Sequence, residues 1–301
     1  VYDTIFGADL TVREESAEFL RRLETGENLP LMTSCCPAWV KYVENERPEF
    51  LKNLSTARSP MQMFASVLKE NYRKKDAEDG RTTFHIAIMP CTAKKMEARR
   101  EEFRDAYGVP YVDLVLTTQE VVQMMKESGI RFQMLEKESP DLPYGMGSGA
   151  AEIFGTSGGV AEAVIRCCTP DKSKNALRTI EHSGLRGTDA VRFAEVTING
   201  RKVRAAIVHG LGSAAKLLDQ IQSGEVQADL VEVMSCRTGC VGGAGQPYAL
   251  MSTKLKRAHG LYEIDRSAMF KRSERNPVLD AMYAAGLNER AHELLHHEYK
   301  D

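Results

Sequence analysis

The sequence predicts an α/β fold that is built mainly from parallel strands. Short apolar runs alternate along the chain with segments of helical periodicity, and residues 83–89 are apolar at almost every position. Such a continuous apolar run is typical of a parallel strand that is covered on both faces. Residues 196–208 are the exception, because Asn199-Gly200 predicts the two-residue turn of a β-hairpin. A chain of 301 residues can form one large domain or two lobes.

Composition and charge narrow the functional classes. The formal net charge is −2, so nothing indicates binding to nucleic acid or to an anionic membrane. No apolar run reaches membrane-spanning length, and no signal peptide is present, although residue 1 is Val and not Met. The seven cysteines include two adjacent pairs, which favours reduced or metal-bound thiols over disulfides and predicts a cytoplasmic location. These cysteines are Cys35, Cys36, Cys91, Cys167, Cys168, Cys236 and Cys240.

The first predicted helix begins at a capping box formed by Thr11 and Glu14 and continues to about residue 24. Glu15, Glu18 and Arg22 form a stripe that borders the apolar face of this helix. From the helix alone, a solvated edge is the favoured interpretation of that stripe.

Residues 29–39 contain a short apolar segment, then Cys35 and Cys36, then Pro37 at the first position of a second helix. Cys36 is therefore predicted to lie near a helix N-terminus, where free N–H groups and the helix dipole favour a thiolate. The alternative is a pair of buried cysteines in a core turn. The pair alone does not decide between these two interpretations.

A third helix is predicted from Ser59-Pro60 to about residue 72, followed by a charged surface loop at residues 74–82. The apolar strand at residues 83–89 then ends in Pro90-Cys91, and Lys94 follows three residues later. Lys94 is either a cation that pairs with an anionic ligand or a solvated lysine in the first turn of a helix.

The middle of the chain continues the alternation with a strand at residues 111–116 and a helix capped by Thr117 and Glu120. A polar loop at residues 136–149 precedes a helix that contains Cys167 and Cys168, which its apolar pattern marks as structural. A helix at residues 217–221 leads to a strand beginning at Leu230. The tail at residues 277–297 is predicted to form two short helices.

The segment from Glu232 to Pro247 is the most informative part of the chain. Cys236 and Cys240 lie four residues apart, and three glycines follow within four residues. This pattern predicts a buried strand that opens into a tight loop, where glycine avoids a collision or supplies a positive φ. Thiolates at a strand end suggest the ligands of an inorganic cluster.

Two other patterns imitate known sites. His209-Gly210-Leu-Gly212 follows a strand and resembles a dinucleotide fingerprint, but its strand comes from a hairpin and a plain strand-to-helix turn explains it better. His292-Glu-Leu-Leu-His296 matches the zincin pattern, yet no third ligand is obvious, so a C-terminal helix with histidines at its end is favoured.

Three cysteine motifs at strand ends, at residues 33–39, 89–97 and 232–247, stand in one order along the chain. Together they resemble the catalytic domain of the [FeFe] hydrogenases, and the similarity extends from about Phe6 to the C-terminus. The resemblance implies two lobes of mainly parallel sheet flanked by helices, with an H-cluster in the cleft between them. This cofactor joins a [4Fe-4S] cubane, through a cysteine sulfur, to a two-iron unit that carries CO, cyanide and azadithiolate.

The resemblance also implies roles for individual residues. Cys36, Cys91, Cys236 and Cys240 match the cubane ligands, and Cys240 matches the one that bridges to the diiron unit. The residues matched to proton transfer begin with the thiol beside the cluster and end at the mouth of the relay: Cys35, Glu15, Ser55, Glu18 and Arg22. Lys94 matches the lysine that hydrogen-bonds a cyanide. The residues matched to the diiron pocket are Met234, Met89, Pro90, Ser59 and Phe154.

Some positions depart from the family pattern. Ala244 replaces a usual glycine, Met61 replaces a frequent glutamine near the diiron unit, and Met32 replaces a frequent phenylalanine. The family's domain normally begins with a strand and helices before the position of Val1, so residues 1–301 are expected to be a single H-cluster domain without its N-terminal edge. The sequence has no further cysteine quartets, so no accessory iron-sulfur domain is expected.

The leading functional hypothesis is therefore reversible proton reduction to hydrogen, with a ferredoxin-like electron donor and maturation proteins for the diiron unit. A hydrogen-sensing homologue is the first alternative, and a non-catalytic iron-sulfur assembly factor is the second. Cys35, Glu15 and Glu18 argue against a sensor, whereas Lys94 and Met234 argue against an assembly factor. A nicotinamide enzyme, suggested only by Gly210 and its neighbours, is the weakest hypothesis.

Overall fold

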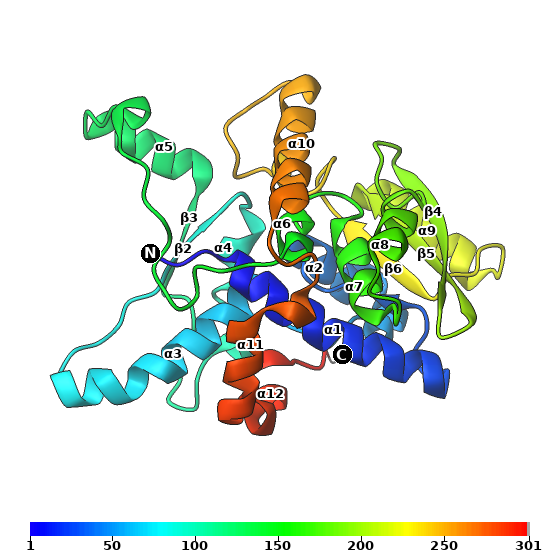
Figure 1. Ribbon diagram of the computed structural model, residues 1–301, viewed down its shortest axis with the longest axis horizontal. Coiled ribbons are helices and arrows are strands. Elements are labelled where there is room, and N and C mark those ends of the chain that lie inside the picture. Colours follow the sequence, from blue (N-terminus) through cyan, green and yellow to red (C-terminus); the bar gives the residue numbers. More distant parts are fainter. Residues whose placement is uncertain (300–301) are drawn as a thin grey trace.

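The structure, a computed structural model that describes residues 1–299, contains two separate sheets (Figure 1). Four strands form the larger sheet in the order β1-β6-β5-β4, with β4 antiparallel to β5 and the other pairs parallel. The smaller sheet pairs β2 with β3 in parallel. The strands are β1 (Leu31–Met32), β2 (Ile86–Met89), β3 (Leu114–Thr117), β4 (Val191–Ile198), β5 (Arg201–His209) and β6 (Leu230–Met234). The predicted α/β class with mainly parallel strands is confirmed.

Helices fill the connections between the strands and surround both sheets. In chain order they are α1 (Ile5–Thr25), α2 (Pro37–Glu46), α3 (Pro60–Asp79), α4 (Ala93–Glu97), α5 (Thr118–Glu127), α6 (Gly149–Ile153), α7 (Gly159–Cys168), α8 (Lys174–Glu181), α9 (Leu211–Gln222), α10 (Met251–Ser267), α11 (Pro277–Met282) and α12 (Asn288–Leu295), with a π-helical turn, η6 (Tyr283–Leu287), before α12. Figure 1 shows α1 between the smaller sheet on the left and the larger sheet on the right, where it contacts both α3 and α7.

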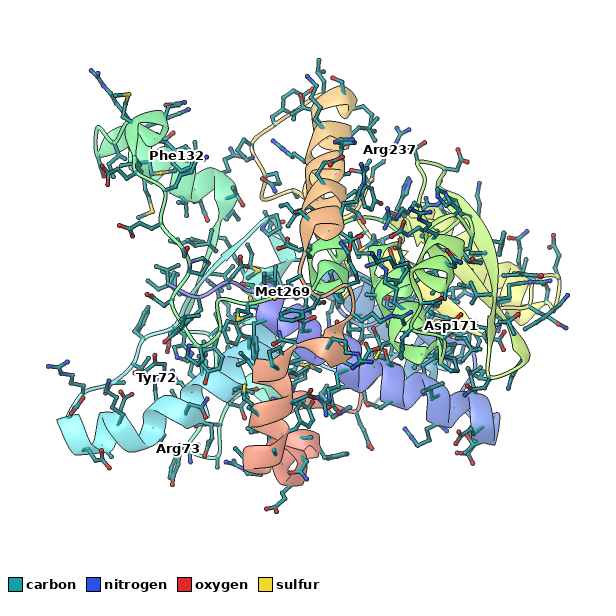
Figure 2. All side chains as sticks on the ribbon, viewed as in Figure 1. Tyr72, Arg73, Phe132, Asp171, Arg237 and Met269 are labelled. Carbon is teal, nitrogen blue, oxygen red and sulfur yellow. The ribbon has the colours of Figure 1, made fainter. Side chains whose placement is uncertain are left out.

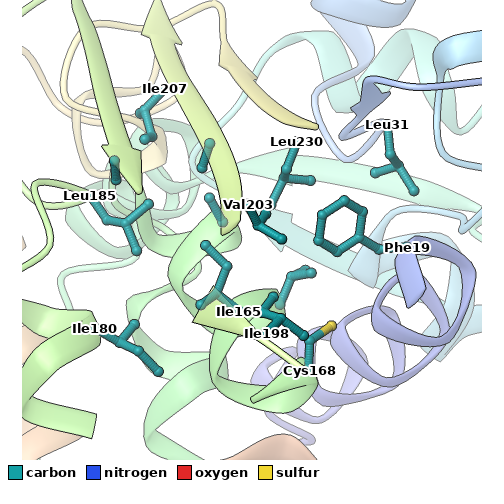
Figure 3. Packing of buried hydrophobic residues seen from close by; sticks show 14 of the residues in the cluster. Phe19, Leu31, Ile165, Cys168, Ile180, Leu185, Ile198, Val203, Ile207 and Leu230 are labelled. Carbon is teal, nitrogen blue, oxygen red and sulfur yellow. The ribbon is translucent and has the colours of Figure 1, made fainter. Parts of the chain in front are cut away.

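The larger sheet is buried on both faces because successive β5 side chains point to opposite sides. Ala205 and Ile207 belong to a core with α1 and α7, whereas Ala206 and Val208 belong to a second core with α2 and α9. Figure 3 shows the first core, in which Phe19, Leu31, Ile165 and Leu230 converge beneath the sheet. Apolar burial of this kind supplies the main stabilising free energy of the fold.

Two predictions about the N-terminal half are wrong. The first helix begins at Ile5, and Thr11 lies inside it with its hydroxyl donating to the carbonyl oxygen of Arg58. The S/T-x-x-E pattern therefore does not mark the start of the helix, because the Thr11 hydroxyl is hydrogen-bonded to a residue that is distant in the sequence. The third helix does begin after Ser59, whose side chain caps it, but it continues to Asp79 through most of the expected loop.

The smaller sheet differs from the expectation of a strand covered on both faces. Strand β2 begins only at Ile86, and the side chains of Ile86 and Ile88 are about half exposed, at 55% and 52%. The opposite face packs on α3, where Met61, Met89 and Val115 share a small core. On the outer face, Ile86 and Ile88 line a pocket that Val121, Met124 and Met125 of α5 also border.

Several helices had no sequence prediction, and the largest of these is α10. It has no continuous apolar stripe, and Asp265 is its one buried residue within the described chain. Figure 1 shows α10 projecting upward from its contact with α6, and Figure 2 labels Phe132 on the segment after α5, which also projects outward. The predicted Asn199-Gly200 hairpin turn and the Thr117–Glu120 capping box are both confirmed.

Candidate metal and proton-transfer site

The larger sheet brings the first and third cysteine motifs together. β1 and β6 are parallel, with Met32 opposite Val231, so the segments that leave the two strands emerge at the same edge. The Sγ atom of Cys36 lies 3.3 Å from the Oγ atom of Ser235, the residue before Cys236. Cys36 is also the residue immediately before α2, as the sequence predicted. Strand register, and not proximity in the sequence, creates this contact.

Glycines of the third motif bring the smaller sheet to the same place. The N–H of Gly245 donates to the carbonyl oxygen of Pro90 at 3.0 Å. A Cβ atom added to Gly243 would lie 2.1 Å from that oxygen, and one added to Gly245 would lie 2.5 Å from the nitrogen of Cys91. Gly239 has a φ of +84°, which favours glycine. The glycines therefore permit contact between two backbone segments, whereas Ala244 between them is exposed and its methyl group is tolerated.

Four half-buried or buried thiols surround one volume at this junction. Burial raises the pKa of Cys240, and the charges of Cys36, Cys91 and Cys236 raise it further. Burial likewise raises the pKa of Cys91 and of Cys236, and a hydrogen bond from the Ala244 backbone partly offsets it at Cys236. A thiolate at Cys91, Cys236 or Cys240 therefore needs a cation, which iron would supply.

The spacing of the thiols distinguishes a cluster from a single ion. A tetrahedral ion with metal–sulfur bonds of about 2.3 Å holds its sulfur atoms about 3.8 Å apart. Among residues 1–299, no three cysteine sulfurs lie within 4.8 Å of one another. The donor set is soft and sulfur-only, and its spread suits a larger iron-sulfur body.

Cys35 occupies an apolar pocket beside the four thiols. It shares a buried cluster with Phe154 and Met234, against which Cys240 packs. Burial raises the pKa of the Cys35 thiol well above its ordinary value, and the charge of Glu15 raises it further. The thiol therefore stays protonated and can donate a proton. On the smaller sheet, Met89 is buried against Met61, the residue that departs from the family pattern.

Lys94 is buried, so the alternative of a solvated lysine is wrong. Its Nζ atom donates to the carbonyl oxygen of Cys35 at 3.2 Å and to Glu97 at 2.7 Å, and the Ser59 hydroxyl donates to the same Glu97 oxygen at 3.1 Å. Burial alone would lower the pKa of Lys94, but the charge and hydrogen bond of Glu97 outweigh it and raise the pKa. The ammonium group therefore stays charged next to the cysteines.

The stripe on α1 is also buried, contrary to the solvated edge that the helix alone favoured. Glu15, Glu18 and Arg22 are 1%, 5% and 4% exposed. Glu18 accepts hydrogen bonds from Arg22 at 2.6 Å and from the buried Ser55 hydroxyl at 2.9 Å. One oxygen of Glu15, Oε2, has no hydrogen-bond partner. The predicted relay residues are thus neighbours in the fold.

Glu15 stands between Cys35 and Glu18 electrostatically. Burial raises its pKa to about 8, and the negative charge of Glu18 contributes in the same direction. The carboxyl group is therefore mostly protonated at neutral pH. A buried acid with a pKa near the working pH can both accept and release a proton.

Two buried carboxylates near the site were not singled out from the sequence. Glu97 holds Lys94, and its signal was present as the i, i+3 partner in the second motif. Glu232 accepts from the backbone N–H groups of Gly158 at 2.6 Å and Ala161 at 2.8 Å, which joins β6 to the start of α7. A carboxylate in the middle of an otherwise apolar strand was the available signal for Glu232.

The remaining sequence patterns lie apart from this site. Cys168 is buried in the core below the larger sheet, in agreement with its structural interpretation. His209 ends a strand of a hairpin, as expected for the weaker dinucleotide pattern. The rings of His292 and His296 stack at 5.9 Å, and no described histidine belongs to a group of ligands spaced for a metal ion.

Comparison with known proteins agrees with the fold. Residues 1–244 match the family model described as iron only hydrogenase large subunit, C-terminal domain, and residues 251–301 match that of the iron hydrogenase small subunit. The chain therefore belongs to the iron-only hydrogenase family. No helix of residues 1–299 is long and apolar enough to cross a membrane.

Individual relatives cover nearly the whole chain. It is 40% identical to the NADP-reducing hydrogenase subunit HndD of Solidesulfovibrio fructosivorans, over 99% of this chain and 53% of that protein. It is 38% identical to iron hydrogenase 1 of Clostridium pasteurianum, over 100% of this chain and 54% of that protein. The chain thus spans about half the length of these relatives. The cytosolic iron-sulfur assembly component 3 of Mus musculus is 31% identical, over 99% of this chain and 66% of that protein.

Solved structures show the same architecture. The [FeFe]-hydrogenase HydA(deltaEFG), described in connection with stepwise H-cluster assembly, has a TM-score of 0.81 at 33% identity. A variant of apo HydA1 from Chlamydomonas reinhardtii has a TM-score of 0.82 at 34% identity. Each comparison covers 99% of this chain and 84% of the other.

Proposed function

We propose that this chain is a single H-cluster domain that catalyses the reversible reaction 2H⁺ + 2e⁻ ⇌ H₂. The observation that carries the proposal is the buried thiol of Cys35, which packs in one apolar cluster with Cys240 and lies close enough to the buried Glu15 to feel its charge. A structural cluster alone has no need for a protonatable path of this kind. The relatives named as hydrogenases support the same activity.

The residues present suit the cofactor. Cys36, Cys91, Cys236 and Cys240 would hold a [4Fe-4S] cubane, and Cys240 would be shared with the diiron unit. Phe154, Met234, Met89, Pro90 and Ser59 would enclose that unit, with the ammonium group of Lys94 directed at a cyanide. When bound, the H-cluster supplies the electrons and the iron centre at which protons are reduced.

The protein's own part is to exclude water and to move protons. Cys35 would donate its thiol proton towards the cofactor and recover one from Glu15. Glu15 would be supplied by Glu18, with the Ser55 hydroxyl between the two carboxyl groups. The high pKa of Cys35 and of Glu15 keeps both groups protonated at rest, which suits donation.

A non-catalytic assembly factor is a second candidate, because the mouse assembly component matches over nearly the whole chain. Such a protein needs the cubane ligands but not a proton path. The joint presence of Cys35, Glu15, Glu18 and the buried Lys94 favours the enzyme. The same relay residues argue against a hydrogen sensor.

The proposal extends to partners. Electrons would come from a ferredoxin-like carrier in the cytoplasm, and dedicated maturation proteins would insert the diiron unit. The match to the iron hydrogenase small subunit and the relationship to other hydrogenases support an electron-carrier partner in general.

Hydrogen evolution tests the function. The chain is reconstituted anaerobically with its cubane, loaded with a synthetic diiron cofactor, and assayed with reduced methyl viologen. We expect activity in the wild type and a loss of at least about 100-fold in Cys35→Ala, since general acid catalysis contributes about 10²–10⁴-fold. Cys168→Ala, in the core away from the four thiols, is the control for a lost cysteine. No activity in a folded, correctly loaded wild type would contradict the enzyme.

A further inference from the structure

The segment around the third cysteine motif differs in charge from the rest of the chain. From residue 233 to residue 262 the sequence contains four lysine or arginine residues and neither aspartate nor glutamate, although the whole chain has a net charge of −2. This segment comprises the end of β6, the glycine loop and the first part of α10. Positive charge is therefore concentrated next to Cys236 and Cys240. The four cations are Arg237, Lys254, Lys256 and Arg257.

Contacts between α10 and the glycine loop bring these cations together. A Cβ atom added to Gly242 would lie 2.4 Å from the carbonyl oxygen of Arg237 and 3.2 Å from the Cδ atom of Lys254. The guanidinium group of Arg257 donates to the carbonyl oxygens of residues 241 and 247, each at 3.2 Å. Arg257 therefore fixes the loop to the helix, and the loop holds Arg237 and Lys254 on either side of one glycine.

The three other cations have no carboxylate partner. Among the described residues, Arg237, Lys254 and Lys256 form no ion pair, and the side chains of Arg237 and Lys256 are exposed. Arg237 directly follows Cys236, which is only half-buried. Burial raises the pKa of Cys236 and the charge of Lys254 opposes this effect, so the ammonium group is close enough to act on the thiol. Unpaired positive charge thus lies beside a cluster-type cysteine at the surface.

Apolar side chains accompany these cations. Tyr248 and Leu250, in the connection between the glycine loop and α10, are 92% and 68% exposed. Aromatic residues are enriched in protein–protein interfaces and often carry much of their binding energy. Figure 1 shows α10 projecting from the molecule, and Figure 2 labels Arg237 on the same upper side. We call this surface the basic face, and it consists of Arg237, Tyr248, Leu250, Lys254 and Lys256.

Carboxylates at the border of the basic face are paired with cations of their own. Glu263, further along α10, accepts from Arg266 at 2.9 Å. Glu120 accepts from Lys95 at 2.7 Å, and the N–H of Gln119 attaches this part of the chain to the glycine loop at 2.9 Å. The field at the basic face is therefore positive, and such a field attracts partners of negative charge.

We propose that the basic face is the docking surface for an acidic electron-carrying protein, which delivers electrons to a cluster held by the four cysteines. This inference rests on the proposed hydrogenase function, which consumes two electrons for each H₂. In each encounter the reduced carrier loses one electron and the cluster gains it. Electron tunnelling slows steeply with distance, so the carrier has to approach a ligand of the cluster closely. The cations speed the encounter, and Tyr248 supplies an apolar contact.

Isothermal titration calorimetry tests the docking without needing turnover. The full chain, reconstituted with its cubane only, is titrated at low ionic strength with a bacterial two-[4Fe-4S] ferredoxin of net negative charge. We expect Arg237→Glu combined with Lys256→Glu to raise the Kd at least about tenfold, since electrostatic steering changes association rates by about 10–10³-fold. Lys202→Glu is the matched control and should keep the Kd. Lys202 is exposed, at the opposite end of β5 from His209, which pairs with Met234.

An equal Kd in the wild type and the double variant, or no measurable complex with the wild type, would overturn the proposed docking surface. Equally tight binding of cytochrome c, a basic electron carrier, would also overturn it. If the double variant fails to fold, Tyr248→Ala decides the question. Loss of this exposed ring should weaken ferredoxin binding at least about fivefold, and an unchanged Kd contradicts the proposal.

Hydrogen evolution by the loaded enzyme, driven by reduced methyl viologen, separates the two proposals. An active wild type whose ferredoxin binding is unaffected by the substitutions contradicts only the role of the basic face. An inactive wild type that binds the ferredoxin through these residues contradicts only the hydrogenase function.

Discussion

One group of buried charges lies on α1 and another joins α7 to α10, and the two groups are organised differently. The relay on α1 has Glu15 and Glu18 with a single guanidinium, that of Arg22, which donates to Glu18 and not to Glu15. The second group joins α7 to α10, where Arg166 donates to Glu162 at 2.6 Å and to Asp265 at 2.8 and 2.9 Å. The first group leaves the carboxyl group of Glu15 without a hydrogen-bonded guanidinium. In the second group, Glu162 and Asp265 each accept hydrogen bonds from one.

The group that joins α7 to α10 contains a second guanidinium. Arg186 donates to both oxygens of Glu162, each at 2.7 Å, and also reaches Asp265 at 3.2 Å. Oxygens of Glu162, Glu181 and Asp265 lie within 4.8 Å of one another, and each of the three carboxylates forms an ion pair with both guanidinium groups. Burial alone would raise the pKa of Asp265, but Arg166 lowers it. Asp265 therefore remains ionised, and its ion pair with Arg166 holds α10 to α7.

This difference separates buried carboxylates that hold helices together from a buried carboxyl group that can transfer protons. A buried carboxylate with a cation keeps its charge, whereas one without a cation has a pKa near neutrality and can exchange protons. Glu15 belongs to the second kind, with its pKa raised to about 8 and one oxygen lacking a partner. Both groups contain buried carboxyl groups, so burial alone does not show which of them can exchange protons.

The largest expected effect is on activity. Glu15→Gln removes the exchangeable proton but keeps the size of the side chain, so we expect hydrogen evolution to fall about 10²–10⁴-fold with no loss of stability. Glu24→Gln, at an exposed position of the same helix, is the control and should keep full activity. A fully active Glu15→Gln enzyme would show that Glu15 transfers no essential proton. The two groups of carboxylates would then not differ in function.

The next effect is on stability. Arg166→Met leaves Glu162 and Asp265 facing each other in the interior, and we expect a loss of about 3–5 kcal/mol in the free energy of unfolding. Urea denaturation measures it. Arg204→Met breaks an exposed pair with Glu195 and should cost less than about 1 kcal/mol. Equal losses in the two variants would mean that the buried network contributes no more than a surface pair.

A substitution that alters no charge provides a comparison for the substitutions in the two charged groups. Gly243→Ala places a methyl group 2.1 Å from the Pro90 oxygen, so we expect about 1–3 kcal/mol of destabilisation and a lower iron content after reconstitution. Ala244→Gly, at the exposed neighbouring position, should change neither quantity measurably. Normal iron binding by Gly243→Ala would show that the two motifs do not need this close approach.

A further effect on stability is its pH dependence. The carboxyl group of Glu15 ionises near pH 4.5 when exposed but near 8 in the fold, so the folded state binds the extra proton between these values. Raising the pH through this window therefore destabilises the wild type relative to Glu15→Gln, by more than about 1 kcal/mol at pH 8. Denaturation of both proteins at pH 5 and pH 8 measures the difference. Parallel pH profiles would mean that Glu15 ionises normally.

The sequence predicted the features that depend on neighbouring residues. The position of Cys36 before α2, the Thr117–Glu120 capping box, the Asn199-Gly200 turn and the glycine loop after Cys236 all follow from local patterns. The failed Thr11 capping box shows the limit of that approach, because a distant carbonyl group on Arg58 takes the hydroxyl. The environment of a side chain is decided by segments that are remote in the sequence.

The sequence by itself thus determined the α/β class, the set of cysteines and the candidates for proton transfer, since each depends on residue type, periodicity or motif. Tertiary structure decided which candidates are buried and what they meet. Parallel pairing of β1 with β6 brought Cys36 to Ser235, and packing of α1 against α3 and α7 buried Glu15. The return of the chain after α12 placed His296 beside Thr56, 240 residues earlier. The reason is physical: the pKa of a carboxyl group depends on the solvent and charges within a few ångströms, and only folding determines these.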